Sequence, residues 1–334
     1  MSDDALVVGA GPAGLAAAIA LKQAGLRARV LEKGLLVDSI FHFPPQMTFF
    51  TTPDLLEIGG LPFVTPYEKP TRVEALRYYR RVVEHHGLVV ELDRQATALS
   101  REAEGLRVAA RSQRGESFEY RAPAVVMATG YYDHPNRLGI PGEDLPHVSH
   151  YSGDPHALWR RHVLVAGGRN SAAIAALEAF RAGAASVTLV HRGERFSDSI
   201  KYWIRPDLDN RVQAGSIAAR LRSRVVEIRP GSAVVEGPEG RCELPADAVL
   251  LLTGYHPDVE LLRAAGVTVD PQTLAPRHDP QTLETDVPGL FVAGSLSAGL
   301  QTNRIFIETG RFHGEAVARE LAGRGGLLRD GRRV

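Results

Sequence analysis

Short apolar runs and longer helical patterns alternate along the chain. Residues 5–8 (ALVV) and 28–31 (ARVL) are apolar runs, and the helical stretch 13–24 lies between them. Continuous apolar runs of this length are typical of buried parallel strands. The same order recurs over residues 163–192, where two apolar runs flank the stretch AAIAALEAFRAG. The pattern predicts an α/β protein with two Rossmann-like βαβ units.

Between these units, polar and apolar positions predict a helix and several strands. Thr71-x-x-Glu74 has the form of a capping box that opens a helix to His86, and Gly87 ends this helix. The alternating residues 88–121 predict a β-meander.

A glycine-rich turn follows the first predicted strand. Gly9, Gly11 and Gly14 form G-x-G-x-x-G, and Glu32 ends the next strand. In a dinucleotide-binding turn, the first glycine permits the bend, the second admits the pyrophosphate to the helix N-terminus, and the third allows close packing. An acid after the second strand accepts hydrogen bonds from the ribose. We therefore predict a site for FAD or NAD, rather than a glycine-rich turn in an unrelated α/β protein.

The second glycine turn has different chemistry. Arg169 stands where the second glycine should be, and its side chain either obstructs the pyrophosphate or turns outward and adds positive charge. The following strand ends in His191-Arg192-Gly193-Glu194-Arg195. Arginines pair with a 2′-phosphate that an acid would repel, so this turn favours NADPH over the alternative of an ordinary solvated loop. The predicted NADPH-binding residues are Gly167, Gly168, Arg169, Asn170, Ser171, His191, Arg192 and Arg195.

Composition narrows the classes of partner and location. The 334 residues suffice for two or three domains, and 39 basic residues balance 39 acidic ones. A net charge of zero gives no support for a nucleic-acid or membrane partner. The apolar run 13–21 is too short to span a bilayer, so we expect a cytoplasmic protein. One cysteine excludes an internal disulfide and agrees with a reducing compartment.

Further segments carry a family resemblance. The strands VVMATGYY (125–132) and VPGLFVAGS (287–295), with the two glycine turns, resemble the two-dinucleotide-domain flavoproteins. The segments SIFHFPPQMTFF, GGRNSA, TGYHPD and IFIETGRFHG are similar to the thioredoxin-reductase-like bacillithiol disulfide reductases (YpdA type). This resemblance implies a thioredoxin-reductase-like fold of two three-layer ββα domains, with FAD and NADPH as cofactors. The FAD domain would span residues 1–133 and 257–334, with an NADPH domain, 134–256, inserted.

The resemblance also implies where the flavin lies. The ATG strand and the late glycine turn return the chain to the flavin, and a helix from about Asn303 to Leu321 would point its N-terminus there. Ala13 occupies a position that is cysteine in many relatives, and Ser295 one that is commonly aspartate. The expected FAD-binding residues are Gly9, Gly11, Pro12, Ala13, Gly14, Glu32, Lys33, Ser39, Thr48, Ala96, Thr129, Gly130, Gly294, Ser295, Asn303 and Ile305.

The chain lacks the dithiol of a thioredoxin reductase. In those enzymes C-x-x-C precedes the second glycine turn, and the matching stretch HVSHYSGD (147–154) has no cysteine. Cys242, in a predicted strand, is alone, and we interpret it as structural. We therefore predict that reduced flavin passes electrons directly to a small-molecule disulfide or a small redox protein. No catalytic residue is assigned, and the 12 histidines show no metal-ligand spacing.

Three alternatives remain open from the sequence. A ferredoxin or flavodoxin–NADP reductase of the same fold also lacks the dithiol, although the terminus GGLLRDGRRV has no aromatic residue to shield the flavin. A flavin monooxygenase is a further alternative, but HVSHYSGD matches its signature only in part. The last is a redox sensor that binds both cofactors and turns over negligibly. A homodimer or homotetramer is expected.

Overall fold

The structure, a computed structural model, describes residues 3–330, which form two compact units. Unit 1 contains residues 3–42, 47–134 and 255–330, and unit 2 contains residues 43–46 and 135–254. The chain crosses between the units at His134/Pro135 and Gly254/Tyr255. The sequence did not predict that residues 43–46 would group with unit 2. The assignment of these units to FAD and NADPH stays a prediction.

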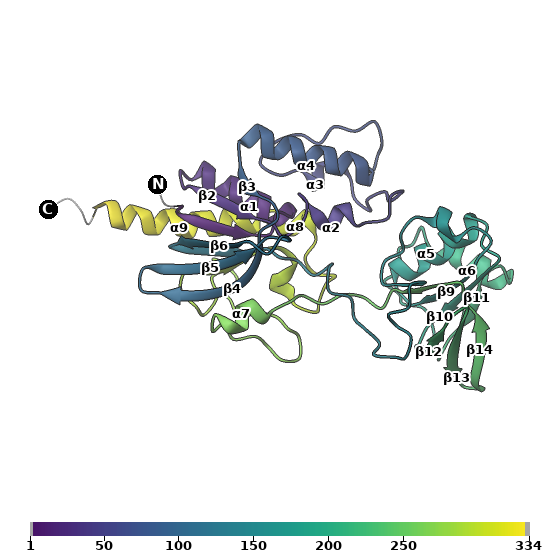
Figure 1. Cartoon of the computed structure of the whole chain (residues 1–334). Helices are drawn as coiled ribbons and strands as arrows, with labels where there is room; N and C mark the ends of the chain where they lie inside the picture. Colours follow the sequence, from purple (N-terminus) through teal and green to yellow (C-terminus); the bar gives the residue numbers. More distant parts are fainter. Residues whose placement is uncertain (1–2, 331–334) are drawn as a thin grey trace. The chain divides into compact units, whose positions relative to one another are not determined.

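Unit 1 is built on a five-stranded sheet in which every neighbouring pair is parallel (Figure 1). Its strand order is β16-β7-β1-β2-β3, with bounds β1 Ala5–Val8, β2 Ala28–Leu31, β3 Val89–Glu91, β7 Ala124–Met127 and β16 Leu290–Val292. Helices α1 (Pro12–Gln23) and α9 (His313–Asp330) pack against each other. A Cβ on Gly314 would lie 2.4 Å from the Cα of Ala17, so glycine is what permits this close approach.

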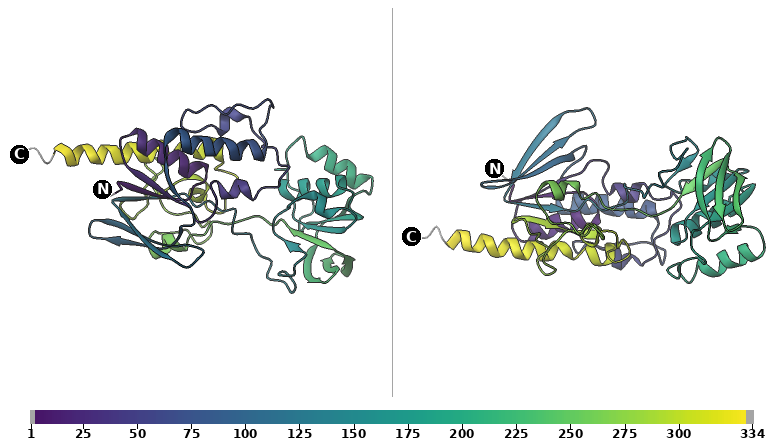
Figure 2. Two further views of the ribbon diagram at one scale, coloured as in Figure 1. Left: turned by 45° about the horizontal axis from the view of Figure 1, so that its top comes forward. Right: turned by 90° about the horizontal axis from the view of Figure 1, so that it is seen from below.

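A small antiparallel sheet covers the parallel sheet of unit 1. It consists of β4 (Gln95–Glu102), β5 (Gly105–Arg111) and β6 (Ser117–Ala122), drawn in blue in Figure 2. Leu99, Leu106 and Val108 of this sheet share one core with Leu6 and Val8 of β1. The helix–sheet–sheet layering confirms the predicted ββα fold. The predicted meander over residues 88–121 was wrong at its start, because Val89–Glu91 pairs with β2 in the parallel sheet.

Two predicted helices of unit 1 differ in outcome. The capping box of Thr71 and Glu74 is present, and α4 (Arg72–His86) ends at Gly87 in the left-handed region. The helix predicted from Asn303 to Leu321 was wrong at both ends. The chain forms α8 (Ile307–Gly310) and then α9, and residues 303–306 are not helical. The N–H of Leu300 donates to Thr273 O at 2.7 Å, so this tertiary contact and the turns after it delay the helix.

Shorter elements complete unit 1. They are α2 (Asp38–Phe41), α3 (Pro53–Leu56), α7 (Glu260–Ala264) and the 3₁₀ turn η2 (Gly294–Ala298). No helix within residues 3–330 is both long and apolar enough to cross a membrane.

Unit 2 repeats the same layering. Its parallel sheet has the order β11-β10-β9-β15-β8, with bounds β8 Val148–Ser149, β9 His162–Ala166, β10 Ser186–Val190, β11 Ala218–Arg220 and β15 Ala248–Leu251. The remaining elements are η1 (Pro155–Leu158), α5 (Asn170–Arg181), α6 (Arg205–Gln213) and an antiparallel sheet of β12 (Arg224–Arg229), β13 (Ser232–Gly237) and β14 (Gly240–Pro245). Cys242 lies on β14 and is exposed, and its interpretation as structural rather than catalytic stays a prediction. A strand of this outer sheet has one face in solvent, and Cys242 lies on that face.

Candidate flavin and nucleotide sites

The first glycine turn places each glycine in a different environment. A Cβ on Gly9, whose φ is +107°, would lie 2.5 Å from Ala128 O, and one on Gly14 would lie 1.9 Å from Gly9 O. A Cβ on Gly11 would meet nothing within 4 Å. Gly11 is also the N-cap of α1 and supplies no side chain to cap it. Open space at an uncapped helix N-terminus fits a pyrophosphate group.

Glu32 is held beside this turn by the backbone. Its side chain is buried, and its two carboxylate oxygens accept hydrogen bonds from Ala10 N–H at 2.7 Å and Gly34 N–H at 2.9 Å. Burial raises the pKa of Glu32 above its usual range. Each carboxylate oxygen can accept a second hydrogen bond, so Glu32 is oriented and still able to bind ribose hydroxyls.

Two later turns of unit 1 come together near α1. A Cβ on Gly130 would lie 3.9 Å from the hydroxyl of Ser295, and one on Gly294 would lie 2.7 Å from the Cβ of Ala13. The buried hydroxyl of Thr129 has no hydrogen-bond partner within residues 3–330. A buried hydroxyl without a protein partner is costly, so Thr129 fits a site completed by a bound polar group.

The other predicted flavin-binding residues have different surroundings. Lys33 forms an ion pair with Asp133, Ser39 lies on α2, and Ala96 packs on the core from β4. Asn303 and Ile305 lie in the irregular segment before α8. The predicted helix N-terminus at Asn303 was therefore wrong, and these two residues offer no helix dipole. Pro12 is simply the first residue of α1.

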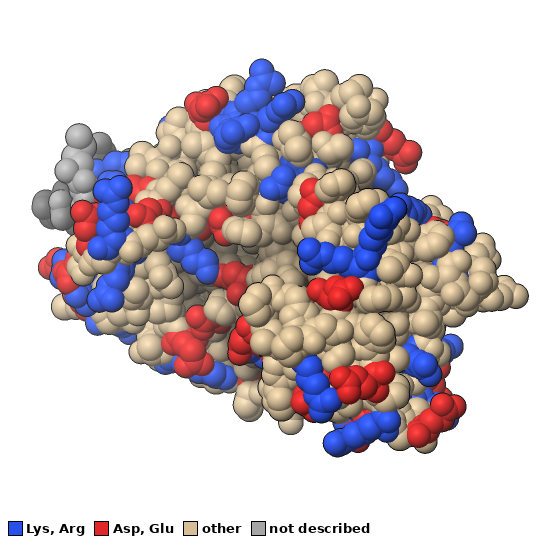
Figure 3. Space-filling model, turned by 45° about the vertical axis from the view of Figure 1, so that its right-hand side comes forward, with Lys and Arg blue, Asp and Glu red and all other residues tan. Residues whose placement is uncertain are grey.

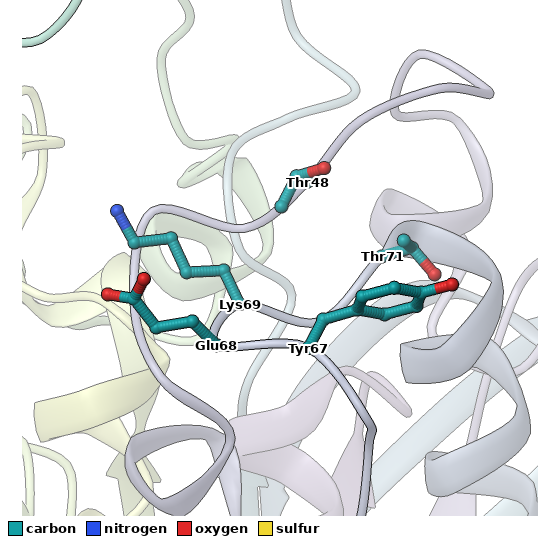
Figure 4. A pocket seen from close by; sticks show the side chains of 5 residues that line it. All are labelled: Thr48, Tyr67, Glu68, Lys69 and Thr71. Atoms are coloured by element: carbon teal, nitrogen blue, oxygen red, sulfur yellow. The ribbon is translucent and has the colours of Figure 1, made fainter.

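Thr48 lies in a β-bridge with Thr71 and faces a hollow of about 330 Å³. Tyr67, Glu68 and Lys69 complete its lining. In Figure 4, the Tyr67 ring and Thr71 lie on one side of the hollow, and the side chains of Glu68 and Lys69 extend to the other. The predicted contact between Thr48 and the flavin stays a prediction.

In unit 2, the second glycine turn rests on His191. A Cβ on Gly168 would lie 2.2 Å from the His191 ring, and one on Gly193 would lie 2.7 Å from it. Burial, and then the charge of Arg192, lower the pKa of His191, which favours a neutral ring packed under the turn. Arg169 is exposed, which agrees with the alternative in which its side chain turns outward.

The side chain of Asn170 makes hydrogen bonds that the sequence did not predict. Its side-chain amide donates to Ser199 O at 3.1 Å and accepts from Lys201 N–H at 2.9 Å. Ser197 N–H also donates to Gly168 O at 3.0 Å. Asn170 therefore ties the loop 197–201 to the glycine turn, and no local pattern announces such a contact between residues about 30 apart.

The arginines predicted to bind the 2′-phosphate lie on the surface after β10. Arg192 is exposed, and Arg195 pairs with Asp198 at 2.9 Å, with about three quarters of each side chain exposed. An ion pair this exposed is weak, so it leaves Arg195 able to bind a phosphate. On the face drawn in Figure 3, basic and acidic side chains are interspersed.

Comparison with known proteins identifies the family. Residues 6–294 match the pyridine nucleotide-disulphide oxidoreductases. The chain belongs to this family. It is 41% identical over 325 residues to bacilliredoxin reductase Bdr of Bacillus subtilis (strain 168), covering 97% of this chain and 99% of that protein. It is 30% identical over 302 residues to a ferredoxin–NADP reductase of Ignicoccus hospitalis, covering 88% of this chain and 90% of that protein.

Solved structures with a similar fold carry names of the same family. Bacillithiol disulfide reductase Bdr (YpdA) from Bacillus cereus is 38% identical, with a TM-score of 0.94 over 97% of this chain and 100% of that chain. The Staphylococcus aureus protein of the same name is 35% identical, with a TM-score of 0.90 over 97% of this chain and 99% of that chain. Thioredoxin reductase of T. acidophilum, at 18% identity and a TM-score of 0.74 over 97% of this chain and 99% of that chain, shares the fold.

These findings confirm the predicted fold, the resemblance and the cofactors. The protein is an NAD(P)H-dependent flavoprotein oxidoreductase that uses FAD and NADPH. The individual cofactor-binding residues stay predictions.

Proposed function

We propose that this protein passes electrons from NADPH through FAD to a low-molecular-weight disulfide of the bacillithiol type. The observation that carries the proposal is the 41% identity, over almost the full length of both chains, to a protein named bacilliredoxin reductase. The similarity to two solved structures named bacillithiol disulfide reductase supports the same substrate class.

The chemistry that bound FAD would supply is the transfer of electrons from NADPH to the disulfide. The chain's own residues would bind and orient the two cofactors. The open space at Gly11 would admit the pyrophosphate, Glu32 would accept hydrogen bonds from the ribose hydroxyls, and Thr129 and Ser295 would offer hydroxyls at the adjoining turns. In unit 2, Arg192 and Arg195 would bind the 2′-phosphate of NADPH.

The proposal includes no protein dithiol. Cys242 is the one cysteine of the chain, it is exposed, and it lies on the outer sheet of unit 2. One thiol cannot form an internal disulfide, and position 13 is alanine. The acceptor must then meet the cofactor itself, or bring its own thiol.

Reoxidation of the reduced protein tests the acceptor. Anaerobic holoprotein reduced with one equivalent of NADPH is mixed with bacillithiol disulfide, a bacilliredoxin mixed disulfide, ferredoxin, flavodoxin or oxygen. We expect a bacillithiol-containing disulfide to restore the absorbance of oxidised flavin fastest. Faster reoxidation by ferredoxin would instead favour the alternative that the Ignicoccus relative represents, and fastest reoxidation by oxygen would favour an oxygenase.

A cytoplasmic location and a homodimeric or homotetrameric state also belong to this proposal. The single cysteine agrees with a reducing compartment. Light scattering of the purified holoprotein measures the number of subunits.

A further inference from the structure

Three backbone segments of unit 1 meet at Gly294. Its φ of +67° is in the left-handed region, and an added Cβ would lie 2.7 Å from the Cβ of Ala13 at the start of α1. A Cβ on Gly310 of α8 would lie 3.2 Å from the Cα of Gly294. The turn is therefore packed directly against two helical segments, and the next residue, Ser295, lies beside Gly130.

Side chains hold both backbone groups of Gly294. The buried hydroxyl of Ser297 donates to Gly294 O at 2.8 Å. The N–H of Gly294 donates to Nδ1 of His313, the first residue of α9, at 3.1 Å. This second bond requires a ring nitrogen with a free lone pair, so it requires His313 to be neutral with its proton on Nε2.

The surroundings of His313 favour that neutral form. Burial lowers the pKa of His313 below its usual range, and the charge of His278 lowers it further. His278 lies in the loop before β16. Glu315 is an acidic residue in the first turn of the same helix as His313. As the pH falls below this lowered pKa of His313, protonation of Nδ1 removes the acceptor for Gly294 N–H.

We propose that His313 is a positioning residue for the flavin: its neutral imidazole holds the Gly294–Ser295 turn, and a proton on Nδ1 releases it. The affinity for FAD then depends on pH, strong when His313 is neutral and weaker when it is charged. This proposal deepens the proposed function, because it assumes that unit 1 binds FAD next to Ser295.

Release of FAD from the holoprotein tests the proposal. The FAD dissociation constant is measured from the fluorescence of released flavin between pH 5 and pH 8.5 for the wild type, His313→Asn and His313→Ala. Asparagine keeps an oxygen near the place of Nδ1 and does not titrate. We expect His313→Asn to bind FAD as the wild type does at pH 8, with no loss on acidification. His313→Ala should bind FAD about 2- to 13-fold more weakly than the wild type does at pH 8, the loss expected for one hydrogen bond, and its affinity should not change with pH.

Two further variants separate this bond from general effects. His278→Asn removes the neighbouring charge, so the acid transition in FAD affinity should move to higher pH. His85→Asn, an exposed histidine of α4, is the matched control and should keep the wild-type profile.

The visible spectrum and midpoint potential of bound flavin give a readout that does not depend on turnover. We expect both to change in His313→Ala and to be restored in His313→Asn. If His313→Ala fails to fold, the pH profiles of the wild type and His313→Asn still decide, since they must differ. Equal profiles would overturn the proposal. Absence of FAD from the wild-type protein would instead overturn the assignment of unit 1 as the flavin site.

Discussion

At the scale of single residues, Glu32 combines a buried carboxylate with two backbone donors. Replacing it by alanine removes the acceptors of Ala10 N–H and Gly34 N–H, and it also removes the expected acceptors of the ribose hydroxyls. We expect Glu32→Ala to weaken FAD binding roughly 10- to 150-fold, since hydrogen bonds to a charged group contribute about 1.5–3 kcal/mol.

Fluorescence titration of the flavin-free protein with FAD measures this change. Glu32→Gln is the matched variant, because it keeps the shape and loses the charge, and it should show a smaller loss. Unchanged affinity in both variants would remove Glu32 from the site. Release of FMN in place of FAD would contradict the site as a whole.

Arg192 tests the preference for NADPH. An exposed arginine that pairs with the 2′-phosphate contributes about 1.5–3 kcal/mol, and NADH lacks that phosphate. We expect Arg192→Ala to raise the apparent constant for NADPH roughly 10- to 150-fold and to leave NADH nearly unchanged. Steady-state oxidation of both nucleotides measures it, and Arg241→Ala, on the β14 hairpin, is the control. Equal effects on the two nucleotides would mean that Arg192 does not bind the 2′-phosphate.

Ala13 tests whether a thiol beside the flavin turn matters. Its Cβ faces Gly294, so cysteine there would put a thiol at the N-terminus of α1, where the helix dipole lowers a thiol pKa. If the cofactor reduces the acceptor directly, the wild type turns over bacillithiol disulfide and Ala13→Cys gains little. That is our expectation, measured as NADPH oxidation with the disulfide. Ala18→Cys, buried in the middle of α1, is the control. A nearly inactive wild type and an active Ala13→Cys would show that a thiol is required.

At the scale of elements, the loop 197–201 depends on the first residue of α5. Asn170→Ala removes two side-chain hydrogen bonds that tie this loop to the second glycine turn. We expect NADP⁺ to bind about 2- to 13-fold more weakly, because the turn loses its support. Calorimetric titration of the holoprotein with NADP⁺ measures the change. Asn210→Ala, on α6, should have no effect. Equal affinities for the wild type and Asn170→Ala would mean that the loop does not position the nucleotide.

The sequence predicted those elements whose signals are local. The turn of Gly9, Gly11 and Gly14 and the capping box of α4 could be predicted because a few neighbouring residues determine them. The start of the C-terminal helix could not, because Leu300 bonds to Thr273 and its neighbours form turns instead of a helix. The hydrogen bond between His313 and Gly294 could not be predicted for a related reason. It joins residues 19 apart across a turn, and periodicity carries no signal for it.

At the scale of the whole molecule, the two units repeat one layering of helices, parallel sheet and antiparallel sheet. The two units differ in the residues that follow β2 in unit 1 and β10 in unit 2. Unit 1 has the buried Glu32 there, and unit 2 has the exposed Arg192. We therefore expect one architecture to bind two dinucleotides, with the charge after this strand distinguishing FAD from NADPH.

Removing the one cysteine of the chain tests whether electron transfer needs a protein thiol. Cys242→Ser leaves a protein with no cysteine. Because Cys242 is exposed on β14, its replacement should leave the free energy of unfolding almost unchanged, within about 0.5 kcal/mol. We expect NADPH oxidation and reduction of the acceptor to stay near the wild-type rate. Thermal denaturation and turnover with bacillithiol disulfide measure the two parts. Loss of all turnover with FAD still bound would contradict the thiol-free route, and it would point to a disulfide between subunits through this exposed thiol.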